Sequence, residues 1–154
     1  MQVTIIALGS RGDVEPYVAL GTGLKRAGHT VRVLTSQDFQ SVVTGYGLEF
    51  YGTGGDMHAI AQSMQMLLEQ GNFLKILSSM GETAQRLANQ ASACGLAACQ
   101  GVDLIIGGLG GLFVGLALSE KLGIPFVPAF YYPLTPTREF PNACLLYTSP
   151  SPRD

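Results

Sequence analysis

Residues 1–16 read MQVTIIALGSRGDVEP and contain a strand, a turn and the start of a helix in direct succession. Residues 3–8 are continuously apolar and rich in β-branched side chains, which is typical of a strand buried on both faces. The glycine-rich turn 9–13 follows at once. From Val14 onward, apolar side chains recur every three or four residues, which predicts a helix that stops near Gly28.

The rest of the chain repeats this order of strand and helix. The alternation predicts an α/β fold, a Rossmann-like and mostly parallel sheet with helices on both faces. Ligands of such sheets bind beyond the carboxyl ends of the strands, so we expect a site at the turn 9–13, the loop after Ile106 and the loop from Phe130 onward. Further strands are expected at residues 30–34, 48–51, 103–106 and 125–129, and further helices at residues 35–44, 56–68, 79–99 and 112–122.

The composition limits the classes of function. The 154 residues suit one domain, and an apolar share of 47% excludes disorder for most of it. Only 13% of residues are charged and the net charge is -2, so no nucleic-acid partner is expected. Three cysteines and two histidines give neither a disulfide framework nor a cluster of metal ligands, and we expect no metal and a cytoplasmic location.

One stretch invites a membrane interpretation. Residues 104–118 carry no charge, but they are fewer than the roughly 20 residues that a spanning helix needs. Five glycines interrupt them, which indicates a buried strand, a turn and a buried helix. We therefore expect peripheral membrane association at most.

The turn 9–13, Gly-Ser-Arg-Gly-Asp, holds the candidate chemistry. Its two glycines permit close backbone approach, while Ser10 and Arg11 can donate hydrogen bonds to an anion at the positive end of the following helix. Asp13 adds a carboxylate at the same place. The residue types leave two roles open for Asp13, a helix N-cap or a general base.

Two other classes of function stay open at this point. A dinucleotide-dependent oxidoreductase needs its glycine loop directly after the first strand, whereas Gly21 and Gly23 lie inside the predicted helix. It also needs an acidic residue at the end of the second strand, where Leu-Thr-Ser stands at residues 34–36. A non-catalytic binding module of the same fold is the other alternative.

Four segments in order carry a resemblance to a known family: GSRGDVEP at 9–16, GLKRAGH at 23–29, GLEF at 47–50 and PLTPTREFP at 133–141. Together they resemble the N-terminal domain of the GT-B glycosyltransferases of the family 28 type, which include sterol and lipid UDP-glucosyltransferases and antibiotic glycosyltransferases. The resemblance implies two Rossmann-like domains, an N-terminal one for the acceptor and a C-terminal one for the nucleotide-sugar. Residues 1–143 then form an incomplete acceptor domain, without a His-x-Gly-Gly donor motif and inactive without its donor-binding partner domain.

The same resemblance implies an inverting transfer of a hexose from a UDP-sugar to a hydroxyl of a lipophilic acceptor, with no metal or other cofactor. Asp13 matches the family's base. Ser10, Arg11 and Gly12 match the loop that faces the donor phosphates and the acceptor hydroxyl. The residues expected in the acceptor pocket by position are Tyr131, Tyr132, Thr135, Thr137 and Arg138.

The final residues, 144–154, read CLLYTSPSPRD and break with the composition before them. Two Ser-Pro steps and the lack of periodicity predict an unstructured end. The string also resembles the translation of a sequencing-adapter artefact. On either interpretation the tail takes no part in the predicted fold.

Overall fold

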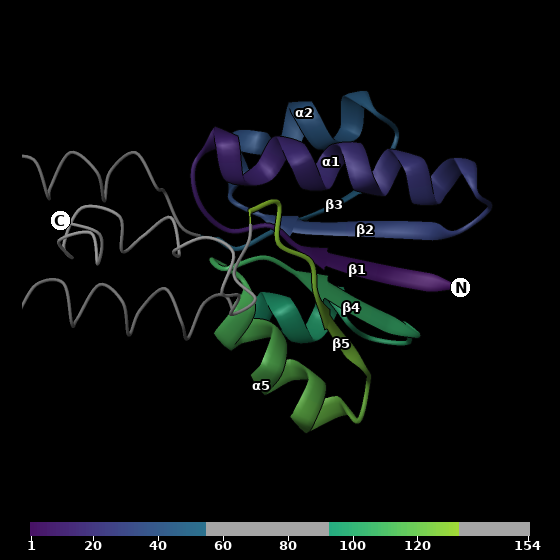
Figure 1. Ribbon diagram of the computed structural model, residues 1–154, viewed down its shortest axis with the longest axis vertical. Helices are drawn as coiled ribbons and strands as arrows, with labels where there is room; N and C mark the ends of the chain where they lie inside the picture. Colours follow the sequence, from purple (N-terminus) through teal and green to yellow (C-terminus); the bar gives the residue numbers. More distant parts are fainter. Residues whose placement is uncertain (55–92, 133–154) are drawn as a thin grey trace, which may run out of the picture.

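The structure is a computed structural model that describes residues 1–54 and 93–132 (Figure 1). Several sequence-based expectations lie outside these residues and stay predictions. They are the helix at 56–68, most of the helix at 79–99, the tail at 144–154 and the pocket residues Thr135, Thr137 and Arg138.

The described residues form a parallel α/β fold. The sheet has the order β3-β2-β1-β4-β5, and every neighbouring pair of strands is parallel. The predicted Rossmann-like sheet is therefore confirmed. The elements are β1 (Gln2–Ile6), α1 (Arg11–Arg26), β2 (Thr30–Thr35), the 3-10 helix η1 (Gln37–Phe39), α2 (Gln40–Gly45), β3 (Glu49–Gly52), β4 (Leu104–Gly107), α5 (Leu112–Leu122) and β5 (Phe126–Pro128).

Helices cover both faces of the sheet, as predicted. Figure 1 shows α1 and α2 on one face and α5 on the other. Each face has its own apolar cluster, because the side chains of a strand alternate between faces. Ile5 and Val33 pack with Val14 and Val18 of α1, whereas Ile105 packs with Leu118 of α5.

Local signals explain where the helices stop. α1 ends at Arg26, and Gly28 follows with a φ of 88°, which favours glycine. α5 ends at Leu122 before Gly123, whose φ is 66°. The helix expected from residue 35 begins later, as η1 with Ser36 at its N-cap, because Thr35 still pairs with β3.

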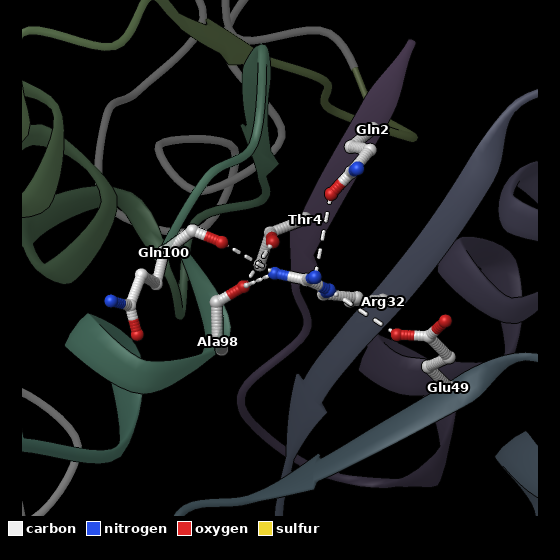
Figure 2. Close-up of polar contacts among 6 residues, drawn as sticks. All are labelled: Gln2, Thr4, Arg32, Glu49, Ala98 and Gln100. Atoms are coloured by element: carbon white, nitrogen blue, oxygen red, sulfur yellow. Dashed lines mark hydrogen bonds and ion pairs between the residues drawn. The ribbon is translucent and has the colours of Figure 1, made fainter.

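A cluster of polar contacts around Arg32 connects the amino-terminal parts of strands β1, β2 and β3 (Figure 2). The Arg32 guanidinium donates to Glu49 Oε2 at 3.2 Å and to the Gln100 carbonyl at 2.8 Å. Thr4 donates to the Ala98 carbonyl at 2.7 Å. These contacts join β1, β2 and β3 to the segment that precedes β4, and they leave the carboxyl ends of the strands free for a site.

The uncharged stretch 104–118 forms β4, a glycine turn and the first part of α5, as predicted. No helix within residues 1–54 and 93–132 has the length and apolar character required to cross a membrane.

Candidate functional site

The sheet order changes direction beside β1, since β2 lies on one side of it and β4 on the other. Chains that leave the carboxyl ends of such neighbouring strands part toward opposite faces, and the crevice between them is where α/β sheets bind ligands. The first turn, residues 9–13, follows β1 and leads into α1. The second turn, residues 107–111, begins at the last residue of β4 and leads into α5.

Ser10, rather than Asp13, is the N-cap of α1. Ser10 has extended backbone angles, φ -77° and ψ 177°, while Asp13 already lies in the first helical turn as the third residue. The Asp13 side chain reaches back, and its Oδ2 accepts from the Ser10 N–H at 2.8 Å and from the Ser10 hydroxyl at 2.7 Å. The interpretation of Asp13 as the N-cap is therefore wrong, although its carboxylate does satisfy a backbone donor at the start of the helix.

The other oxygen of Asp13 faces the loop after β5. Oδ1 accepts a hydrogen bond from the hydroxyl of Tyr131, which lies 118 residues further along the chain. The Tyr131 ring meets Tyr17 edge-on, with 5.8 Å between the ring centroids, and Tyr132 edge-on at 5.0 Å. The structure thus brings the first turn and the loop from Phe130 together, as the sequence predicts.

These hydrogen bonds stabilise the charged form of Asp13. The hydrogen bond from Tyr131 lowers the pKa of the Asp13 carboxyl below its usual value, and the bonds from Ser10 lower it further against the opposing effect of burial. The same contact raises the pKa of the Tyr131 hydroxyl to about 12. At neutral pH the proton therefore stays on Tyr131, and Asp13 is a carboxylate.

Tyr17 is a residue of the site that the sequence analysis does not single out, although it lies on the apolar face of the predicted helix. Its hydroxyl donates to the Ala129 carbonyl at 2.6 Å and so holds the chain after β5 against α1. Gly108 packs on the same hydroxyl, because a Cβ at that position would lie only 1.8 Å from it. The sequence signal that could have found Tyr17 is its spacing from Asp13, because residues four apart lie on one helix face.

Arg11 and Gly12, the other predicted residues of the first turn, have surroundings different from those of Asp13. Arg11 forms an exposed ion pair with Glu15 at 2.6 Å and lines an open groove of about 690 Å³ between α1 and α2, which Asp13 does not line. Gly12 has open space around it, with only the Ser10 hydroxyl within 4 Å of a built Cβ. Among the described side chains, no group of three or more is placed to hold a metal ion.

Several solved structures that share this fold are glycosyltransferases. The Streptomyces sp. SF2575 glycosyltransferase SsfS6 is 29% identical, with a TM-score of 0.60 over 84% of this chain and 39% of that chain. Its complex with thymidine diphosphate gives a TM-score of 0.61 at 28% identity. The calicheamicin glycosyltransferase CalG4, at 18% identity and a TM-score of 0.59 over 90% of this chain and 32% of that one, shares the fold.

Sequence relatives agree with the structural ones. The sterol 3-beta-glucosyltransferase of Yarrowia lipolytica is 34% identical over 95% of this chain, and that of Cryptococcus neoformans is 36% identical over 93%. The chain spans about a tenth of the length of these curated relatives, 10% and 9% respectively. The pattern of the glycosyltransferase family 28 N-terminal domain matches residues 3–141, and the chain belongs to this family.

Proposed function

We propose that this chain forms the acceptor-binding domain of a UDP-glycosyltransferase and that Asp13 is its general base. The observation that carries the proposal is the environment of the Asp13 carboxylate. It lies at the carboxyl end of β1, it is ionised at neutral pH, and both of its oxygens accept hydrogen bonds from hydroxyl groups. An ionised carboxylate that is placed to accept from a hydroxyl group can take the proton of an alcohol as its oxygen attacks.

The proposed sugar transfer needs one base from the protein. Asp13 takes the proton of the acceptor hydroxyl while that oxygen attacks the anomeric carbon of the sugar. A carbon–oxygen bond forms to the acceptor, and the bond from the anomeric carbon to the diphosphate breaks with its electron pair on UDP. Attack from the face opposite the leaving group inverts the anomeric centre, and the proton on Asp13 later passes to water.

The acceptor class follows from the surroundings of Asp13 and from the relatives. Tyr131, whose hydroxyl donates to the carboxylate, packs edge-on with Tyr17 and Tyr132, and this aromatic cluster suits an alcohol on an apolar framework. The sequence relatives are sterol glucosyltransferases by name, which favours a sterol or a similar lipid. The second substrate is a nucleotide-sugar bound by a C-terminal domain, and the proposed chemistry uses no metal.

The first turn argues against a dinucleotide cofactor. A pyrophosphate on a Rossmann turn needs the free N–H groups at the start of the first helix. Here the Asp13 carboxylate accepts from the Ser10 N–H at 2.8 Å and places a negative charge where the pyrophosphate would bind. Family membership and this geometry favour the transferase over the oxidoreductase.

The test is Asp13→Asn in the full-length protein, assayed with UDP-glucose and a sterol. We expect kcat to fall about 10²–10⁴-fold, because asparagine keeps the shape of the side chain but cannot take the proton. Asp38→Asn is the matched control, since Asp38 is an exposed aspartate in η1 after the neighbouring strand β2. An Asp13→Asn variant that keeps more than about a tenth of the wild-type kcat would exclude Asp13 as the base.

A further inference from the structure

The two oxygens of Asp13 have different partners, and this difference points to a role for Tyr131. We propose that the Tyr131 hydroxyl occupies the position from which the acceptor hydroxyl must donate to Asp13 Oδ1, so that the acceptor binds by displacing it. The inference rests on the proposed function and adds a residue that controls access to the base.

Oδ2 is not available to an acceptor. Its donors are the backbone N–H and the hydroxyl of Ser10, at 2.8 and 2.7 Å, and both belong to the turn that starts α1. The backbone N–H could be replaced only if the start of the helix opened, and the Ser10 hydroxyl stays beside it on the same turn. Oδ1 is different, because its donor among the described residues is Tyr131, which comes from another part of the chain.

Tyr131 is able to leave. Its side chain belongs to a residue that is 47% exposed, and it lies beyond the end of β5 at Pro128. Tyr17, in contrast, is 4% exposed, and its hydroxyl is tied to the Ala129 carbonyl. Tyr131, which donates to Oδ1, is thus the exposed member of the pair. Tyr17 is the buried member, and it stays in place.

The displaced group and the incoming group are chemically alike. A phenol and an alcohol each offer one O–H donor, so an acceptor hydroxyl can make the same hydrogen bond to Oδ1. Tyr17 and Tyr132 are the rings that contact Tyr131, so the carbon framework that carries the hydroxyl would meet apolar aromatic surface there. The substrate class that fits is an alcohol on a rigid apolar ring.

Tyr131→Phe in the full-length protein tests the inference with UDP-glucose and a sterol. The variant keeps the ring and removes the competing hydroxyl. We expect KM for the acceptor to fall about tenfold or more, as for the loss of one competing hydrogen bond to a charged group. Tyr46→Phe is the matched control, because Tyr46 is an exposed tyrosine at the end of α2.

The pH profile separates this role from simple packing. Among the described residues, the hydroxyls of Tyr131 and Tyr17 face Asp13, Tyr132 packs on Tyr131, and Arg11 is paired with Glu15. Removal of the Tyr131 hydroxyl raises the pKa of Asp13 toward its ordinary value, so the acid limb of kcat/KM should move to higher pH. An NMR titration of the Asp13 carboxyl carbon in the 154-residue chain should show the same direction without any assay of activity.

The outcomes are distinct. A lower acceptor KM together with the upward shift of the acid limb, both absent in Tyr46→Phe, supports the displacement. An unchanged or raised KM, or an Asp13 titration that matches wild type, overturns it even if Asp13→Asn is inactive. Failure of the proposed function appears differently, as a wild-type protein without sugar transfer or an Asp13→Asn variant that keeps its activity.

Discussion

The first turn, residues 9–13, and the second turn, residues 107–111, follow neighbouring parallel strands, and each leads into a helix. Both are rich in glycine, Gly-Ser-Arg-Gly-Asp in the first and Gly-Gly-Leu-Gly-Gly in the second. By position alone, either turn could bind an anion at a helix start. Only the first carries polar side chains, and the surroundings of the glycines differ as well.

The glycines of the second turn are needed for packing. A Cβ at Gly110 would lie 2.0 Å from the Leu8 carbonyl oxygen, and one at Gly111 would lie 2.6 Å from that of Ile6. The second turn therefore rests directly on the backbone that leaves β1. In the first turn a Cβ at Gly12 meets nothing closer than 3.8 Å. The second turn is thus packed against the end of β1, whereas the first turn has open space at Gly12 and holds the carboxylate proposed as the base.

Gly110→Ala should have the largest effect on stability. The Cβ meets backbone rather than a flexible side chain, so relief requires movement of β4 and α5 away from the end of β1. We expect the free energy of unfolding to fall by about 3 kcal/mol, the upper part of the usual range for overpacking. Denaturant unfolding measures it.

Gly23→Ala is the control for that substitution. Gly23 is an exposed residue inside α1, and a Cβ there meets nothing within 4 Å. Alanine should stabilise the protein there by about 0.5–1 kcal/mol, because it favours the helix. Equal effects of the two substitutions would contradict the interpretation of the second turn as a packed support.

Gly9→Ala should have the next largest effect. Gly9 has a φ of 140°, which side chains disfavour, and a Cβ would lie 2.5 Å from Asp13 Oδ2. We expect a loss of about 2 kcal/mol from backbone strain. The Asp13 carboxylate should also move, so kcat of the full-length protein should fall by more than the loss of folded protein explains. A stability loss with unchanged kcat would show that the carboxylate tolerates displacement.

Much of this fold is predictable because its signals are local. The helix expected at 112–122 is α5, Leu112–Leu122, since an apolar pattern runs up to the stop at Gly123. The strand expected at 30–34 is β2 with one more residue. The first turn was also located from sequence, because a buried strand, two glycines and a helical period stand next to one another.

The arrangement of the site was less predictable because it depends on distant contacts. The hydrogen bond between Asp13 and Tyr131 joins residues 118 positions apart, and no spacing rule predicts such a pair. Aspartate is a preferred N-cap, which makes a capping role for Asp13 plausible from sequence, but serine is preferred equally and stands three residues earlier. The packing of the second turn against the backbone could not be predicted, because glycine has no side chain and so forms no pattern of apolar and polar positions.

Ser10→Ala should have a smaller effect that depends on pH. The N-cap serine is lost together with its hydroxyl bond to Asp13 Oδ2, and we expect a cost of about 1 kcal/mol at pH 7. Because the Ser10 bonds lower the pKa of Asp13, this contribution is fully present above the unfolded pKa of about 3.9. It should shrink as the pH falls through the lower pKa of the folded state. A difference that stays constant down to pH 2 would show that the carboxylate is not involved.

Gly12→Ala should have the smallest effect, and it tests the comparison most directly. Gly12 and Gly110 are both glycines in turns at the same edge of the sheet, but only Gly110 is pressed against backbone. Gly12 lies in the first turn of α1, where its φ is not positive, and an added methyl group points into open space. We expect the free energy of unfolding to change by no more than about 0.5 kcal/mol, as for other surface substitutions. If the methyl group leaves stability intact but raises KM for the acceptor or the sugar donor, the open space at Gly12 is occupied by substrate during catalysis. If stability falls by about 2 kcal/mol or more, the first turn is as tightly packed as the second, and the distinction between a packed turn and an open one fails.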